Sequence, residues 1–274
     1  MDSFDSKWKP SRAGPASIQG WMIELFHRSL EIPKLGVARI PSPGLSREWG
    51  GATKSWVDDS ERVLLDDSVN GNGGTARKME RLSVEKAGPR KTVFFPPELT
   101  TCAIVTCGGL CPGINDVIRS LVMHAHYGYG IRRVLGLRYG YESLNPACGH
   151  NPVDLTPERV DKIHHMGGSV LGTSRGIQDA VIMVDQIEDL DIQVLFVVGG
   201  DGSQRGVRDI VNEATKRELC LSVIGIPKTI DNDIPLVDKT FGFDTAVEEA
   251  VRPIHCANVE AMAAPNGVGI VKLM

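Results

Sequence analysis

A regular alternation of short apolar runs and helical stretches begins near Val93, and it limits the possible folds more than any other feature. Apolar runs cover residues 102–106, 133–137, 194–198 and 221–226. Helical spacing covers residues 114–127, 157–166, 178–190, 203–217 and 245–262, the last with a proline at position 253 that predicts a kink or an end. This order predicts an α/β fold, a doubly wound and mostly parallel sheet. Ligands of such sheets bind beyond the carboxyl ends of the strands, so the residues after each run are candidates for the site.

The overall charge and the cysteine content exclude several classes of protein. Thirty basic and 34 acidic residues leave a net charge of −4, so bulk electrostatics do not favour nucleic acid or an anionic membrane as a partner. No apolar run approaches the roughly 20 residues of a membrane helix, and the first residues lack the pattern of a secretory signal. Six cysteines in 274 residues indicate reduced thiols rather than a disulfide framework. We expect a cytoplasmic protein, with the plastid left open.

The first ninety residues differ from the rest of the chain. They contain all four tryptophans, between stretches rich in proline, glycine and serine. The spacing of apolar residues predicts one helix over 18–26, and the composition predicts a flexible linker over 68–75. We interpret residues 1–92 as an irregular extension and linker without chemistry of its own.

The first strand end is followed by a glycine-rich turn, residues 106–115. Glycines let backbone N–H groups approach a phosphate, and the next helix adds the positive end of its dipole. A tight turn without a ligand is the alternative. Cys107 and Cys111 are a weak signal for a metal site, because no second pair of ligands accompanies them.

The second strand end carries Gly199, Gly200, Asp201, Gly202 and Ser203. A carboxylate among glycines is well placed to bind Mg²⁺ that carries phosphate oxygens. A plain Asp-Gly turn is the alternative. Several kinase classes share this pattern, so it indicates phosphate binding rather than a particular substrate.

The third strand end leads into Lys228 and then Asp231-Asn232-Asp233. If the segment is extended, the two carboxylates project to the same side. One could accept a proton while the other acts on a metal or on the local field, and a cation between them would offset their repulsion. A structural role as caps or turn residues is the alternative.

In this order and at these spacings the three segments closely resemble the ATP-dependent 6-phosphofructokinases, especially the plant and protist type with a long N-terminal extension. Residues 167–176 and 239–250 support the resemblance, which covers residues 93–274. It implies that ATP is bound by Gly109, Arg175, Gly176, Gly200, Asp201, Gly202 and Ser203, with Asp201 as the Mg²⁺ ligand and Arg175 near the transferred phosphoryl group. It also implies that the sugar phosphate is bound by Thr229, Ile230, Asp231 and Met274, with Asp231 as the general base and Asp233 as its partner near the metal.

The implied reaction moves the γ-phosphoryl group of Mg-ATP to the 1-hydroxyl of fructose 6-phosphate, the committed step of glycolysis, in a homo-oligomer that is a tetramer in the family. Residues 93–250 would form the Mg-ATP domain, and 251–274 would begin an incomplete sugar-phosphate domain. Met274 resembles the first residue of the family's Met-Gly-Arg motif. We therefore expect the 274-residue chain alone to turn over little and to associate through an exposed edge at 268–274.

Two alternatives stay open. Pyrophosphate could be the donor: Gly202 favours ATP, because an aspartate there would obstruct the α-phosphate, but Lys228 is shared with pyrophosphate users. The chain could also be a truncated, non-catalytic nucleotide-binding protein. Its early end supports that interpretation, whereas the intact Asp201, Asp231 and Asp233 oppose it.

Overall fold

The structure, a computed structural model, describes residues 31–43, 56–64, 83–176, 178–234 and 237–273. The predicted helix over 18–26 and the predicted linker over 68–75 lie outside the described residues. The chain divides into two compact units, Met1–Lys34 with Trp56–Arg90 and Leu35–Ser55 with Lys91–Met274. The first unit contains an antiparallel pair, β2 (Arg62–Leu64) and β3 (Ser83–Glu85). The second contains another, β1 (Ile40–Pro41) and β4 (Thr92–Val93), and the main sheet.

The main sheet has five strands in the order β7-β6-β5-β8-β9. Their bounds are β5 Thr101–Thr106, β6 Arg133–Leu137, β7 Val153–Asp154, β8 Val194–Gly199 and β9 Ser222–Pro227. The pairs β5 with β6, β5 with β8 and β8 with β9 are parallel, and β7 is antiparallel to β6. The four predicted strands and the mostly parallel α/β sheet are confirmed. The sequence did not indicate β7, because two residues are too few to show alternation.

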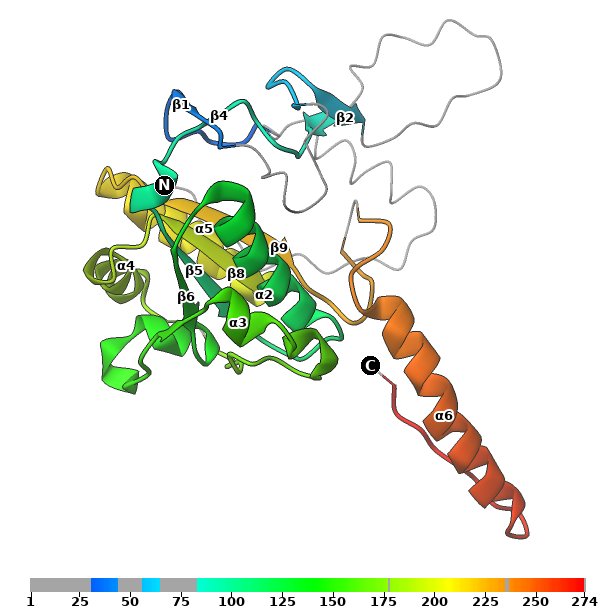
Figure 1. Cartoon of the computed structure of the whole chain (residues 1–274). Helices are drawn as coiled ribbons and strands as arrows, with labels where there is room; N and C mark the ends of the chain where they lie inside the picture. The colour runs from blue at the N-terminus through cyan, green and yellow to red at the C-terminus, as the bar shows by residue number, and fades with distance from the viewer. Residues whose placement is uncertain (1–30, 44–55, 65–82, 177, 235–236, 274) are drawn as a thin grey trace, which may run out of the picture. The chain divides into compact units, whose positions relative to one another are not determined.

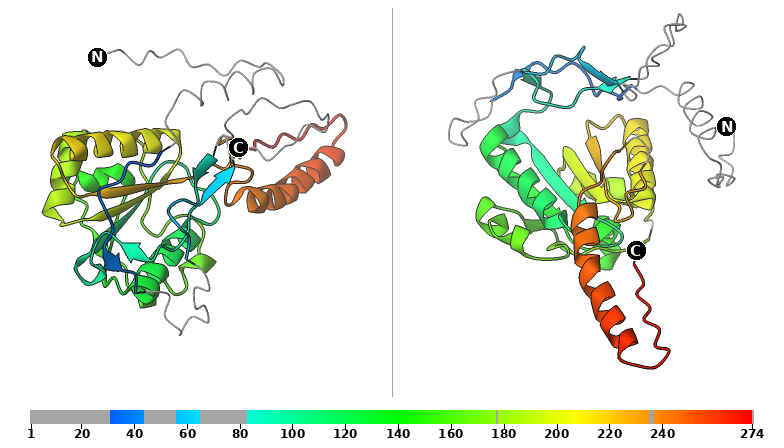
Figure 2. Two further views of the ribbon diagram at one scale, coloured as in Figure 1. Left: turned by 90° about the horizontal axis from the view of Figure 1, so that it is seen from above. Right: turned by 90° about the vertical axis from the view of Figure 1, so that its right-hand side faces the viewer.

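Helices cover both faces of this sheet, as Figure 1 and the right-hand view of Figure 2 show, where the sheet lies between α2 (green) and α5 (yellow). Successive residues of β5 point to opposite faces. Ala103 and Val105 are buried in one core cluster with residues of α4 (Ala180–Asp189) and α5 (Asp201–Lys216). Cys102 and Ile104 are buried in a second cluster, with residues of α2 (Ile114–Met123) and α3 (Pro157–Val160). The doubly wound arrangement predicted from the sequence is therefore present.

The helix ends differ from the predicted ones where local geometry intervenes. The predicted helix 114–127 ends as α2 at Met123 and continues as a π-helical turn, His124–Gly128. The predicted helix 157–166 is wrong as a single element: α3 stops at Val160, and a 3₁₀ turn, Ile163–His165, follows Lys162, which has φ −113° and ψ 4°. Helix α4 starts at Ala180 because the carboxylate of Asp179 accepts a hydrogen bond from Val181 N at 2.8 Å.

Helix α6 spans Phe243–Met262 and continues through Pro253, so of the two expectations at this proline, a kink or an end, the end is wrong. Proline removes the hydrogen bond to the carbonyl four residues earlier. That carbonyl belongs to Glu249, which is exposed, so solvent can satisfy it. Residues 268–273 form no strand in the structure.

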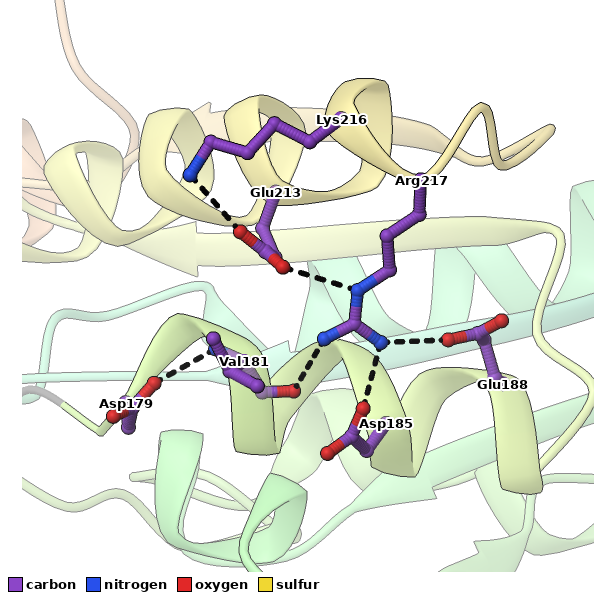
Figure 3. A network of polar contacts seen from close by, with 7 residues as sticks. All are labelled: Asp179, Val181, Asp185, Glu188, Glu213, Lys216 and Arg217. Carbon is purple, nitrogen blue, oxygen red and sulfur yellow. Dashed lines mark hydrogen bonds and ion pairs between the residues drawn. The ribbon is translucent and has the colours of Figure 1, made fainter.

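Arg217 links α5 to α4 on the surface, as Figure 3 shows. Its guanidinium donates to Asp185 at 2.6 Å, to Glu188 at 2.8 Å and to Glu213 at 3.1 Å. Its remaining amino group donates to the backbone carbonyl of Val181 at 3.3 Å. One side chain thus connects the start and the end of α4 with the last turn of α5.

Within the described residues, no helix combines the length and the apolar character that crossing a bilayer requires.

The six cysteines are free thiols in two kinds of environment. Burial raises the pKa of Cys102 to about 12 and that of Cys107 to about 11. Cys148, Cys220 and Cys256 are exposed. Burial and the raised pKa should therefore keep Cys102 and Cys107 from reacting in the native protein, whereas solvent reaches the three exposed thiols.

We expect iodoacetamide at pH 8 to label Cys148, Cys220 and Cys256 in the native protein and to leave Cys102 and Cys107 intact. A thiol with a pKa of about 11 is ionised in only about one molecule in a thousand at this pH. Peptide mass spectrometry against a time course would measure the order of labelling. Early labelling of Cys107 would contradict the burial of this strand end.

Gly206 lets α5 pack against Tyr141, in the 3₁₀ turn Gly140–Leu144. A Cβ atom at position 206 would lie 2.6 Å from the tyrosine ring, and the Tyr141 hydroxyl donates to the backbone carbonyl of Ser203 at 2.6 Å. Replacing Gly206 by a larger residue must therefore displace either the ring or the helix.

We expect Gly206→Ala to destabilise the protein by about 1–3 kcal/mol, although alanine is the better helix former. Gly202→Ala is the matched control in the same helix, because its Cβ would meet no atom within 4 Å. Urea unfolding of both variants would measure the difference. Equal free energies of unfolding for the two variants would mean that close packing against Tyr141 does not contribute to stability.

Candidate functional site

The carboxyl ends of β5, β8 and β9 are joined by backbone hydrogen bonds beyond the strands themselves. Cys107 N donates to Val198 O at 2.8 Å, and Lys228 N donates to Gly199 O at 3.0 Å. Gly108 N donates to Ser174 O at 3.0 Å, which adds the segment 172–176 to the same edge. The three segments that the sequence singled out therefore begin side by side.

A cavity of about 260 Å³ lies at this edge. It is lined by Cys107, Gly108, Gly109, Tyr141, Ser174, Arg175, Gly176, Gly200, Asp201, Gly202, Ser203 and Lys228. All seven residues expected to bind the nucleotide are among them, although they come from three distant segments of the chain.

The backbone around the cavity is suited to an anion. Gly108, in the cavity wall, has φ +80°, a region in which residues with side chains are strained. Asp201 is the first residue of α5, so the positive end of that helix faces the cavity. A Cβ at Gly109 would lie 3.9 Å from an Arg175 nitrogen, which places the guanidinium beside the glycine turn.

Lys228 is a buried cation in this wall. The residue is only 5% exposed, and its ammonium donates to Gly109 O at 2.6 Å. Burial lowers the pKa of this lysine, and nearby Arg175 lowers it further. A buried cation beside a second cation is stabilised by a bound anion. Lys228 follows the third strand end in the sequence, but the family resemblance does not imply a binding role for it.

Asp201 is the expected metal ligand, and its setting fits a metal that arrives with a nucleotide. It is exposed at the cavity, and the described residues contain no group of three or more histidine, cysteine or acidic side chains that could hold an ion. Mg²⁺ typically binds through one or two carboxylates plus substrate phosphates and water. One carboxylate is therefore sufficient for an ion that phosphate oxygens also hold.

Cys107 and Cys111 make different contacts. Cys107 is buried under the strand ends and interacts with the Ser203 side chain, whereas the Cys111 thiol donates to Phe241 O at 3.0 Å. The two thiols therefore have separate partners within the protein.

Thr229, Asp231 and Asp233 form a second group that does not line the cavity. The Thr229 hydroxyl donates to the Asp233 carboxylate at 2.7 Å and accepts from Asp231 N at 3.1 Å. Asn232 has φ +53°, so the segment is not extended, and the expectation that alternation aligns the two carboxylates is not met. Ile230 packs against the core beside α2, and Met274 lies outside the described residues.

Tyr141, Ser174 and Asn232 were not expected as site residues. Tyr141 supports the first turn of α5, and Ser174 accepts the hydrogen bond from Gly108 N. Asn232 was visible between the two aspartates, but its contacts reach residues six and eight positions later, which a local pattern does not show.

Comparison with known proteins adds independent information. A family model described as Phosphofructokinase matches residues 101–274. The chain is 50% identical over 261 residues to "ATP-dependent 6-phosphofructokinase 4, chloroplastic" of Arabidopsis thaliana, covering 95% of this chain and 48% of that protein. It is 41% identical to the "ATP-dependent 6-phosphofructokinase" of Borreliella burgdorferi, covering 89% of this chain and 54% of the relative.

The chain thus spans about half the length of the curated relatives that it matches. Among solved structures, the pyrophosphate-dependent phosphofructokinase of Nitrosospira multiformis aligns with a TM-score of 0.53 at 20% identity, over 60% of this chain and 43% of that one, which concerns the fold alone. Since the family model matches well over half of the sequence, the chain belongs to the phosphofructokinase family.

Proposed function

We propose that this protein takes part in phosphoryl transfer from ATP to the 1-hydroxyl of fructose 6-phosphate. The observation that carries the proposal is the gathering of Gly109, Arg175 and Asp201, with four further expected residues, around one cavity at the strand ends. Membership of the phosphofructokinase family and relatives named ATP-dependent 6-phosphofructokinase support it. In this proposal residues 93–250 bind Mg-ATP, and residues 251–274 belong to the sugar-phosphate domain.

The protein's own residues would orient the two reactants and neutralise charge. The sugar hydroxyl is the nucleophile, so the chain needs to supply positioning and a proton acceptor rather than a covalent intermediate. Arg175 would stabilise charge on the transferred phosphoryl oxygens, and Lys228 would add a second cation from the cavity wall. Gly109, Gly176, Gly200, Gly202 and Ser203 would hold the phosphate chain.

Asp231 would accept the proton of the 1-hydroxyl, with Asp233 as its partner near the metal. The exposed carboxylate of Asp231 makes no hydrogen bond or ion pair within the described residues, so it is available as a base. Thr229, Ile230 and Met274 would contact the sugar phosphate. Mg²⁺, held by Asp201 and the nucleotide, would supply electrostatic stabilisation of the phosphate oxygens.

We also propose a homo-oligomer and a cytoplasmic or plastid location. The free state of all six cysteines supports a reducing compartment.

The decisive experiment is fructose-6-phosphate-dependent release of ADP by the whole encoded protein with Mg-ATP. We expect turnover that requires both substrates. Nucleotide binding without any turnover would contradict the proposed reaction and favour the non-catalytic alternative.

The choice of donor should depend on position 202. We expect Mg-ATP to bind more tightly than pyrophosphate, and Gly202→Asp to weaken ATP binding about tenfold or more, because two like charges about 4 Å apart repel each other by about 1–4 kcal/mol. Gly202→Ala separates bulk from charge, since its Cβ would meet no atom within 4 Å. Calorimetric titration would measure all three proteins. Tighter binding of pyrophosphate by the unmodified protein would reverse the donor assignment.

Replacing Asp201 and replacing Asp231 should affect different steps, ATP binding in the first case and turnover in the second. We expect Asp231→Asn to lower turnover about 10²- to 10⁴-fold with ATP affinity nearly unchanged, because the proton moves only during chemistry. Asp201→Asn should chiefly weaken metal-dependent ATP binding. Asp189→Asn, an exposed carboxylate at the end of α4, is the control and should change neither. Equal loss of ATP binding in Asp201→Asn and Asp231→Asn would contradict this division of roles.

A further inference from the structure

Asn232 connects the segment that carries Asp231 and Asp233 to a later part of the chain through hydrogen bonds. The Asn232 side-chain oxygen accepts from Thr240 N at 2.7 Å, and its amide nitrogen donates to Asp238 O at 3.3 Å. Asparagine tolerates the left-handed backbone found here, φ +53°. Asparagines in turns commonly bond only to the chain within two or three residues. Here both ends of the amide reach a separate segment.

A second contact runs in the same direction. The Thr240 hydroxyl donates to Thr229 O at 3.2 Å, and Thr240 is only 4% exposed. Thr229 in turn donates to Asp233 and accepts from Asp231 N. Thr229 precedes the two aspartates and Asn232 lies between them. Both of these residues are hydrogen-bonded to Thr240.

The segment around Thr240 is itself fixed against the glycine turn. The Cys111 thiol donates to Phe241 O at 3.0 Å. Gly242 has φ +84°, and a Cβ there would overlap the carbonyl of Pro112. Thr240 is thus anchored to the turn that precedes α2, which makes it a rigid support for Asn232.

We propose that Asn232 is a positioning residue, which through Thr240 fixes the direction in which the Asp231 carboxylate points. The inference rests on the proposed function, in which Asp231 accepts the proton. The Asp231 carboxylate has no side-chain partner in the described part of the chain, so its backbone alone sets where it points. That backbone lies between Thr229 and Asn232, the two residues that Thr240 holds. A displaced base reduces the rate of proton transfer without removing a contact to ATP.

The test compares Asn232→Gly with the unmodified whole encoded protein. Glycine adopts the left-handed conformation freely, so the variant keeps the turn and loses both amide bonds. We expect kcat to fall about 10- to 100-fold, the size expected for a displacement of about 1 Å, with the KM and Kd for Mg-ATP changed less than twofold. Glu218→Gly, at a residue with φ +56° in the loop between α5 and β9, is the matched control and should retain full turnover.

Thr240 provides the conservative comparison. Thr240→Val removes the hydrogen bond from the hydroxyl to Thr229 O and should lower kcat. Thr240→Ser keeps the hydroxyl and should keep kcat near that of the unmodified protein. Because both residues act on one support, the combination of Asn232→Gly with Thr240→Val should reduce kcat by less than the product of the two single effects. If the loss of kcat in the double variant equals the product of the two single losses, Asn232 and Thr240 act independently and the proposed shared support is wrong.

Amide hydrogen exchange gives a readout that does not depend on turnover. In Asn232→Gly the amide of Thr240 should exchange faster, while the amides of β5 and β8 stay protected. Unchanged kcat in Asn232→Gly with a freed Thr240 amide would overturn the proposal, and so would equal losses of kcat and ATP affinity. Absence of turnover in the unmodified protein would instead contradict the proposed function itself.

Discussion

Parallel pairing of β5, β8 and β9 determines where the residues of the candidate site can lie. Thr106 is paired with Val198, and Gly199 is paired with Pro227, so the three strands end at one level. The residues that follow them, Cys107, Gly200 and Lys228, then emerge at the same edge without further adjustment. A shift of one residue in this register would turn Ala103 and Val105 out of their cluster and Cys102 and Ile104 into it, which the helices on the two faces oppose.

The cavity at that edge collects positive charge in a protein of net charge −4. Lys228 is buried, Arg175 lies beside Gly109, and the N-terminal end of α5 adds its dipole. Asp201 lines the cavity as the first residue of α5, and its exposed carboxylate is suited to a cation shared with phosphate. In the proposed function, a polyanion would balance the positive charge of Lys228, Arg175 and the helix dipole, and a divalent cation would balance Asp201.

The sequence predicted the central strands closely because they are buried on both faces and read as continuous apolar runs. Helix ends were less accurate, since they depend on individual residues: Asp179 caps α4, and the backbone of Lys162 is not helical, which separates α3 from the 3₁₀ turn that follows. The seven residues expected to bind the nucleotide were predicted from their position after strands together with the family resemblance, and the structure gathers them around one cavity. Tyr141 and Asn232 were missed because each acts through a tertiary hydrogen bond, to Ser203 O and Thr240 N respectively, and no local pattern encodes such a bond.

One peptide bond separates the two halves of the candidate site. The side chain of Lys228 reaches Gly109 O in the cavity wall, whereas the next side chain, that of Thr229, reaches the Asp233 carboxylate. Phosphoryl transfer requires donor and acceptor to approach within about 3–3.5 Å, so the groups that hold them cannot sit on independently moving parts. The loop after β9 meets this requirement through its chain continuity at 228–229 and through the contact of Thr240 with Thr229 O. The strand end that closes the cavity therefore also fixes the start of the segment that carries Asp231, the proposed base.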